Sequence, residues 1–141
     1  MDMGMFGAAI VLGIAAIGSA IGLAIGGQAT IGAWKRCYMN NKPAPFLMVA
    51  FAGAPLTQTI YGYLLMNAML NSTSGNSGFL LGMGLLGGAA MAGSAIAQGL
   101  AAAASSDAFG ETGKGFSQYI TIVGLCETVA LFVMVFGLIN V

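Results

Sequence analysis

Charge is what this sequence has least of. Only 6% of the 141 residues are Asp, Glu, Lys or Arg, and there is no histidine. Soluble domains carry about a quarter charged residues, so a chain this short could not cover a soluble core with polar surface. The four basic and four acidic residues cancel, which argues against a nucleic-acid partner. Apolar residues make up 58% of the chain and the mean hydropathy is +0.91, so the composition predicts a membrane protein in contact with lipid.

Cysteine and basic N-terminal residues are also scarce. The two cysteines, Cys37 and Cys126, are far apart, and without a CxxC pair or a histidine they cannot complete a zinc or iron site. We interpret both as unpaired thiols. The chain starts with Met1 and Asp2 and has no basic segment before a long apolar run, so we expect that run to stay in the mature protein as a helix.

Four apolar stretches each exceed the roughly 20 residues that a membrane-spanning helix needs. They predict an all-α membrane protein with four transmembrane helices at about residues 5–33, 45–70, 78–104 and 118–141. The connector 34–44 carries three basic residues, whereas the short connector between the second and third stretches carries none. By the positive-inside rule we expect connectors 34–44 and 105–117 on the cytoplasmic side and both termini outside. Trp34 and Tyr38 suit interface anchoring, and a partner-binding role for their connector stays open.

The sequence contains two internal matches. Residues 16–21 (Ala-Ile-Gly-Ser-Ala-Ile) resemble residues 91–96 (Met-Ala-Gly-Ser-Ala-Ile), and residues 55–59 match residues 124–128, which sets Gln58 opposite Glu127. These matches predict two duplicated helical hairpins, residues 1–70 and 71–141.

Small residues recur at intervals of four in the first and third stretches. Gly18, Gly22 and Gly26 form one such row, and Gly84, Gly88 and Ala92 form the other. Such rows let helix backbones approach closely in lipid. The second and fourth stretches carry the bulky residues instead, so we expect an inner layer of thin helices and an outer layer of thick ones in a closed ring. We expect the small-residue rows to be buried between copies of the chain.

Glu127 is the only charge in the last apolar stretch and lies near its middle. An ionisable group at this depth costs roughly 2.5 to 3.5 kcal/mol or more, which makes it a candidate functional group. In the second stretch Ala54, Thr57, Gln58 and Tyr61 share one helix face, and Pro55 can free a nearby carbonyl. Gln98 is the only amide in the third stretch, and it reaches the depth of Glu127 if that helix extends to about Phe109, as we expect.

A single carboxylate among neutral oxygens is a shell for a hard cation. A divalent ion would leave excess positive charge in a low-dielectric site, so sodium or a proton remain. A proton needs one acceptor, and the additional amides and hydroxyl therefore favour sodium, with the proton as the alternative. Interhelical hydrogen bonding, worth about 0.6 kcal/mol per bond in membrane bundles, could explain the amides and the threonine. It does not explain Glu127.

Three segments carry a family resemblance. They are Pro55-Leu56-Thr57-Gln58-Thr59-Ile60-Tyr61-Gly62, Ile96-Ala97-Gln98-Gly99 and Glu127-Thr128. Together with the doubled hairpin and the glycine-rich helices, they resemble the membrane rotor subunit of V-type ATPases, also called the c or proteolipid subunit, and in particular the bacterial sodium-translocating K subunit. The resemblance extends over essentially the whole chain.

The resemblance implies a set of residue roles. Glu127 would bind the ion, Gln58, Gln98 and Thr57 would complete its shell, and the hydroxyl of Tyr61 would bond the carboxylate. The backbone carbonyl of Ala54 would be a further ligand. Sodium-binding relatives have leucine where this chain has Ala54, a change that keeps the carbonyl but alters the packing beside it.

The resemblance also implies a mechanism and partners. The chain would be a non-catalytic, ion-translocating subunit in a ring of identical subunits in the bacterial cytoplasmic membrane. The ring would turn against a stator membrane subunit that supplies an arginine, driven through a central stalk by a peripheral ATPase headpiece. With Gln58 and Leu23 at the positions matching Glu127 and Gln98, one ion would cross per four helices, which favours a pump.

Two other classes fit the sequence less well. A small multidrug exporter also has four helices and a buried glutamate, but it lacks the duplication and its carboxylate lies in the first helix. A structural tetraspan protein would have no use for Glu127.

Overall fold

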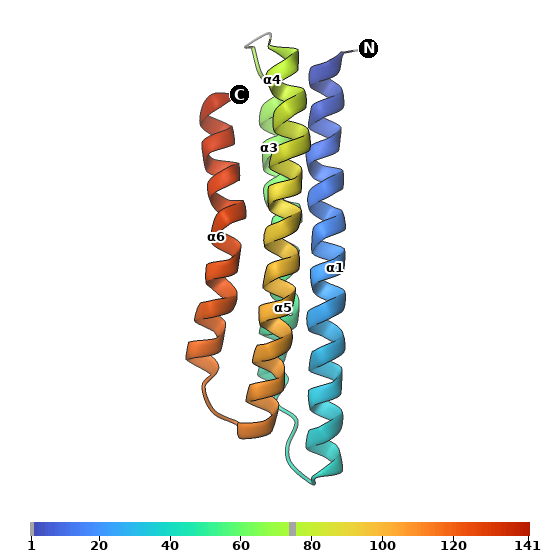
Figure 1. The fold of residues 1–141 in the computed structure, drawn as a ribbon, viewed down its shortest axis with the longest axis vertical. Coiled ribbons are helices and arrows are strands. Elements are labelled where there is room, and N and C mark those ends of the chain that lie inside the picture. The colour runs from blue at the N-terminus through green and yellow to red at the C-terminus, as the bar shows by residue number, and fades with distance from the viewer. Residues whose placement is uncertain (1, 74–75) are drawn as a thin grey trace.

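The computed structural model describes residues 2–73 and 76–141, and every regular element in these ranges is helical (Figure 1). Three described stretches are long and apolar enough to cross a membrane: Met3–Met39 (α1), Ser77–Thr112 and Phe116–Asn140 (α6). Ser77–Thr112 consists of α4 (Ser77–Gly82), a π-helical turn at Met83–Gly87 (η3) and α5 (Gly88–Thr112). The expected all-helical chain with long apolar helices is confirmed.

The remaining span is continuous in direction but not in helix type. It contains a 3₁₀ turn at Phe46–Met48 (η1), α2 (Val49–Gly53), a second 3₁₀ turn at Ala54–Leu56 (η2) and α3 (Thr57–Leu70). Pro55 lies in η2 and has no backbone N–H to donate. The carbonyl of Phe51 accepts from the N–H of Ala54 instead, so the helix tightens at the proline without breaking.

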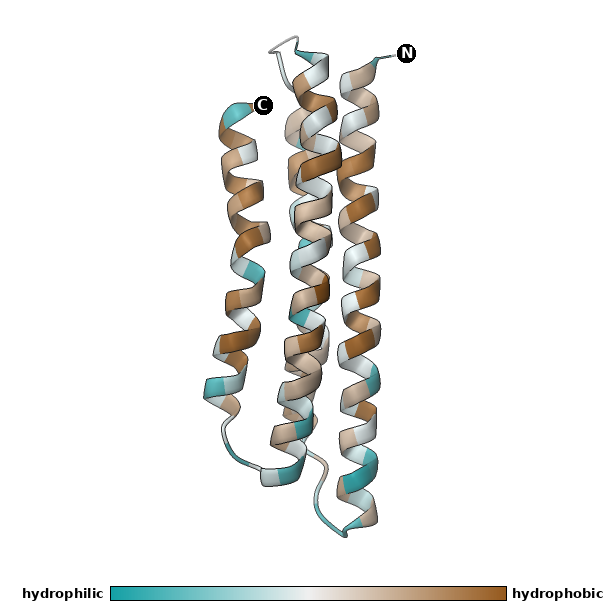
Figure 2. Ribbon diagram, in the orientation of Figure 1, coloured by the Kyte–Doolittle hydropathy of each residue, from teal (hydrophilic) through white to brown (hydrophobic). Residues whose placement is uncertain are grey.

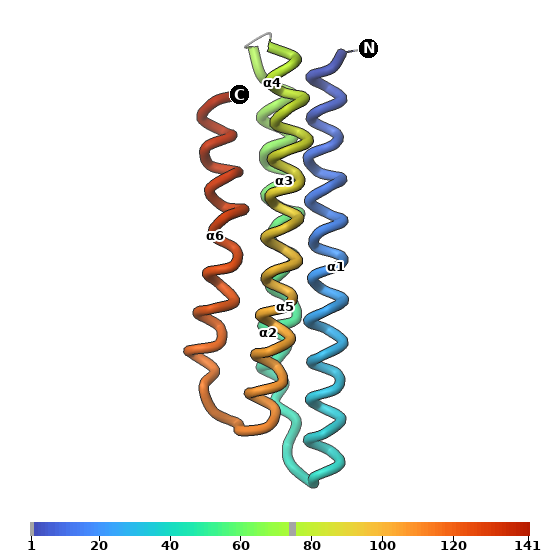
Figure 3. The backbone as a smooth tube through the Cα atoms, in the orientation of Figure 1, coloured from blue at the N-terminus to red at the C-terminus, as the bar shows by residue number. Residues whose placement is uncertain are grey.

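The four spans form a bundle in two layers. α1 packs along α5, α3 packs on α1, α6 packs on α5, and α3 and α6 contact each other. Figures 1 and 3 show both termini toward one end, with the connectors that precede η1 and α6 at the other. Figure 2 shows apolar residues along the helices and hydrophilic residues gathered near the connector end. α1 and α5, which carry the small-residue rows, pack on each other and form one layer. α3 and α6, which carry bulky residues, form the other.

Two helices extend further than the hydropathy predicts. α1 continues to Met39 instead of ending at residue 33, and α5 reaches Thr112 instead of residue 104. The expected extension to about Phe109 is confirmed, and α5 continues three residues further. Arg36 and Cys37 accordingly lie on α1 and not in a connector. Hydropathy detects only the apolar part of a helix, whereas its polar ends remain helical beyond the hydrocarbon.

The connectors are correspondingly shorter than the expected ranges 34–44 and 105–117. α1 is followed by residues 40–45, and α5 is separated from α6 by residues 113–115. Gly113 and Gly115 adopt φ of 67° and 87°, a left-handed conformation that favours glycine. At the same end, the exposed side chains of Arg36 and Asp107 form an ion pair that joins α1 to α5.

The small-residue rows meet inside one chain, which corrects the expectation that they are buried between copies. A Cβ atom on Gly18 would lie 2.2 Å from Cα of Ala92, and one on Gly22 would lie 2.2 Å from the carbonyl oxygen of Ala95. On α5, a Cβ on Gly99 would lie 2.4 Å from the carbonyl oxygen of Gly22. The backbones of α1 and α5 therefore touch directly along these rows.

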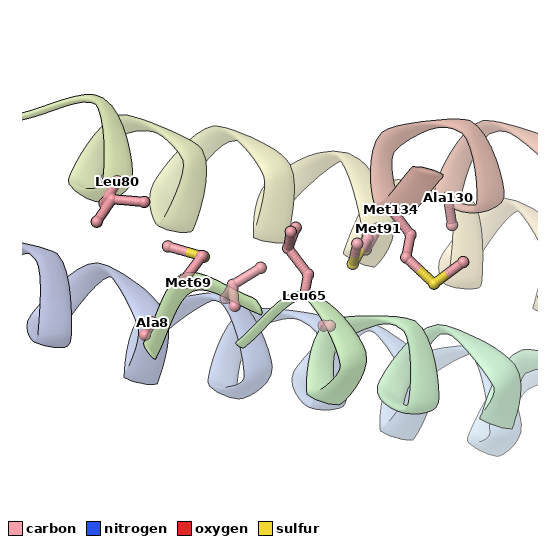
Figure 4. Packing of buried hydrophobic residues seen from close by; sticks show 9 residues of the cluster. Ala8, Leu65, Met69, Leu80, Met91, Ala130 and Met134 are labelled. Carbon is pink, nitrogen blue, oxygen red and sulfur yellow. The ribbon is translucent and has the colours of Figure 1, made fainter. Parts of the chain in front are cut away.

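The apolar core lies on either side of the middle of the bundle. Toward the terminal end, residues from α1, α3, α4, α5 and α6 form one cluster, part of which is drawn in Figure 4. Leu65 and Met91 are fully buried at its centre. A second cluster lies toward the connectors, where Phe51, Phe109 and Phe116 pack edge to face or tilted. The polar residues of the candidate site lie between the two clusters in sequence.

Candidate ion-binding site

Glu127 lies near the middle of α6 and is half-buried. Its two carboxylate oxygens have different partners. The hydroxyl of Tyr61 on α3 donates to Oε1, and Nε2 of Gln98 on α5 donates to Oε2 at 3.3 Å. Three helices thus meet at this carboxylate, and both of its partners are hydrogen-bond donors.

Two fully buried amides connect α3 to α5 behind the carboxylate. Nε2 of Gln58 donates to Oε1 of Gln98 at 2.8 Å, and Nε2 of Gln98 donates to the carbonyl of Val123 on α6 at 2.9 Å. Both glutamines are 0% exposed. A buried amide is costly unless its hydrogen bonds are satisfied, and here each amide has partners on a neighbouring helix.

Thr57 and Ala54 complete the network on the span that contains Pro55. The Thr57 hydroxyl lies 3.2 Å from Oε1 of Gln58 and donates to the carbonyl of Ala54 at 3.1 Å. The same carbonyl accepts the backbone N–H of Thr57 within η2. The 3₁₀ geometry around Pro55 therefore directs the Ala54 carbonyl toward the threonine side chain.

The six residues singled out from the sequence form one continuous network of hydrogen bonds. Glu127 contacts Tyr61 and Gln98 directly, and Gln58, Thr57 and Ala54 follow in turn. Gln98 contacts Glu127 directly, and the helix that carries it extends to Thr112.

The network also contains a serine that sequence reasoning missed. Ser94 lies four residues before Gln98 on α5, accepts from Nε2 of Gln58 at 3.3 Å and donates to the carbonyl of Cys126 at 2.7 Å. The i, i+4 spacing of Ser94 and Gln98 puts them on one helix face, and this signal could have identified Ser94 from the sequence.

The oxygen atoms of the network are of the kind that hard cations prefer: one carboxylate, two amide oxygens, a hydroxyl and a backbone carbonyl. In the structure Oε1 of Gln98 accepts from Gln58, and Nε2 of Gln98 is the atom that contacts Glu127. In residues 2–73 and 76–141, no three His, Cys, Asp or Glu side chains group as a metal cluster would require. Arg36, the only arginine of the sequence, pairs with Asp107 at the connector end. The carboxylate of Glu127 is thus the one full charge of the network.

Long apolar helices around a polar network with one carboxylate define an integral membrane protein. Residues 81–140 match the model of the ATP synthase C-subunit family. The comparison with curated proteins found no match. The matched residues extend from α4 through α6. Ser94, Gln98 and Glu127 lie inside the matched range, whereas the candidate ligands Ala54, Thr57 and Gln58 lie outside it.

Proposed function

We propose that this chain is the rotor-ring subunit of a V-type ATPase membrane sector and transports Na⁺ across the membrane on Glu127 during ATP-driven rotation. The observation that carries the proposal is the hydrogen-bond network that joins Glu127 to Gln98, Gln58 and Thr57. The network joins polar groups of three helices, α3, α5 and α6, to one carboxylate.

The choice of sodium over a proton depends on the donors around the carboxylate. Tyr61 and Gln98 both donate to Glu127, so both carboxylate oxygens act as acceptors, and a bound cation would neutralise the charge. A protonated carboxyl would need only one acceptor, and the amide pair and Thr57 would then serve hydrogen bonding within the bundle alone. The same rotor with H⁺ as the coupling ion is the alternative.

A ring is supported by the outward faces of α1 and α5. Gly93 and Ala97 on α5 are exposed, as are Gly13 and Ala20 on α1, and a Cβ on Gly13 or Gly93 would meet nothing within 4 Å. In the internal match Gly93 corresponds to Gly18, which α5 covers within the chain. The exposed small residues Gly93 and Ala97 on α5 can therefore pack against α1 of the next copy, in the way that Gly18 on α1 packs against α5 within one copy. A head-to-tail contact that repeats by rotation closes into a ring.

The proposed partners would supply a positive charge beside Glu127 and the torque for rotation. Displacing an ion from Glu127 during rotation requires a mobile positive charge, and the sole arginine is engaged with Asp107 at the connector end. A stator membrane subunit would supply that charge, and a central stalk with a peripheral ATPase headpiece would supply the torque. The orientation proposed is connectors in the cytoplasm and both termini outside, in a bacterial cytoplasmic membrane.

Carbodiimide labelling tests the sodium proposal. Carbodiimides modify protonated carboxyl groups, whereas a bound cation keeps the carboxylate ionised. We expect labelling at Glu127 alone, slowed by millimolar sodium near neutral pH but not by potassium at the same ionic strength. A labelling rate that sodium leaves unchanged would replace sodium with the proton. Native mass spectrometry that found only monomers or dimers in mild detergent would contradict the ring.

A further inference from the structure

Ser94 is a buried hydroxyl at the back of the proposed site. It lies on α5, is 6% exposed and bonds directly to neither Glu127 nor Thr57. Its two partners are Nε2 of Gln58 on α3, at 3.3 Å, and the backbone carbonyl of Cys126 on α6, at 2.7 Å. Ser94 therefore joins three helices at the point where the ligand oxygens are arranged.

The hydrogens of these groups fix the direction of each bond. A hydroxyl has one hydrogen, and a backbone carbonyl can only accept. Because the hydrogen of Ser94 is donated to Cys126, the oxygen of Ser94 can only accept from Gln58. The amide nitrogen of Gln58 has two hydrogens, one for Ser94 and one for Oε1 of Gln98.

The orientation of Gln98 is fixed in the same way. Its Nε2 donates to the carbonyl of Val123 at 2.9 Å, which turns its Oε1 toward Gln58. With both N–H groups of Gln58 used on this side, its Oε1 points to Thr57. A reversed Gln58 amide would direct its N–H groups at the cation and its oxygen at Ser94 and Gln98, neither of which has a hydrogen to give there.

We propose that Ser94 is a positioning residue for sodium: it holds the amide of Gln58 with its oxygen toward the ion. This inference rests on the sodium site proposed above. Ser94 does not touch the ion and acts through Gln58, so it sets the affinity for sodium and not the chemistry of the Glu127 carboxyl.

Ser19 provides a matched control within the chain. It occupies the position corresponding to Ser94 in the repeated Gly-Ser-Ala-Ile sequence, is 2% exposed, and its hydroxyl has no hydrogen-bond partner among the described residues. A serine in this sequence context is thus compatible with packing alone. Ser19→Ala removes an equally buried hydroxyl without touching Gln58.

The test measures the sodium concentration that halves the rate of carbodiimide labelling at Glu127 in the assembled protein. We expect Ser94→Ala to raise it about three- to tenfold, the effect of one intramolecular hydrogen bond. Ser94→Cys keeps the volume but bonds weakly, so it should behave alike even if the alanine variant assembles poorly. Ser19→Ala should leave both this value and the labelling rate without sodium unchanged.

A second arm asks whether Ser94 acts through Gln58. In a Gln58→Leu background, adding Ser94→Ala should cause no further loss, because the group that Ser94 orients is gone. A further loss of similar size would overturn the proposal, as would unchanged sodium protection in Ser94→Ala and Ser94→Cys. An unsubstituted protein that sodium fails to protect would overturn the sodium site itself, a result that is distinguishable because it precedes any substitution.

Discussion

Ser19 and Leu23 in the first half of the chain correspond to Ser94 and Gln98 in the second, yet only the second pair belongs to a polar network. The hydroxyl of Ser19 is unpartnered among the described residues, and Gln58 of the first half bonds to Gln98 of the second. Similar local sequence thus gives packing in one half and a candidate site in the other. Gln98 and Glu127 make the difference, because Gln58 and Tyr61 of the first half form hydrogen bonds to them.

The largest loss of stability is expected from a substitution in the contact between α1 and α5, which joins the two halves of the chain. Gly22→Leu should prevent the α1–α5 contact, because its Cβ would lie 2.2 Å from the backbone oxygen of Ala95. Overpacking costs about 1 to 3 kcal/mol when side chains can yield, and a backbone atom cannot. We expect no folded protein in thermal unfolding and detergent gel filtration.

Gly93→Leu separates folding from assembly. The space beside Gly93 is open within one chain, so this variant should fold with normal helix content but give no ring in native mass spectrometry. Intact rings with Gly93→Leu would mean that copies do not meet at this row. A folded Gly22→Leu protein would show that α1 and α5 do not pack as described.

These two glycines show where sequence reasoning stopped. The long apolar helices and the small-residue rows could be read from composition and spacing. Which row faces a helix of the same chain could not, because α1 has small residues on two faces, and the spacing at Gly22 resembles the spacing at Gly13. The choice depends on how the connectors set one helix against another, which is a property of the whole bundle.

The site was more predictable than the packing. A charge at membrane depth is costly, so Glu127 could be predicted as a functional residue, and helical periodicity put Thr57, Gln58 and Tyr61 on one face. Ser94 was missed because serine is common in membrane helices and its role depends on two partners. One of these is the backbone carbonyl of Cys126, which no sequence pattern marks.

Glu127→Gln makes the second half resemble the first, which has Gln58 at the corresponding position. Without the carboxylate, carbodiimide labelling and sodium transport should both be lost completely, while the ring persists. Mass spectrometry of the labelled protein and sodium uptake into vesicles that contain the whole complex measure the two losses. Glu111→Gln, at the exposed end of α5, is the control and should retain labelling. Residual labelling in Glu127→Gln would mean that another carboxyl reacts.

Gln98→Leu copies Leu23 into the second half and should have the next largest effect. It removes a donor to Glu127 and the acceptor of Gln58. Hydrogen bonds to charged groups are the stronger ones, so we expect the half-protecting sodium concentration to rise about ten- to a hundredfold. Labelling without sodium should persist. Equal sodium protection in Gln98→Leu and the unsubstituted protein would remove Gln98 from the proposed shell.

Thr57→Val should have the smallest effect, and it tests whether the span with Pro55 contributes to the site at all. Valine has nearly the shape of threonine, so packing is kept, while the single hydroxyl hydrogen that lies between the Ala54 carbonyl and Oε1 of Gln58 is lost. The expected loss of sodium affinity is about three- to tenfold, as for one neutral hydrogen bond. Thr59→Val, two residues further along α3 and off the face shared by Thr57 and Tyr61, is the matched control. If both variants bind sodium as the unsubstituted protein does, Thr57 is not a ligand. The first half of the chain would then contribute Gln58 alone to the site, and the two halves would differ more than we propose.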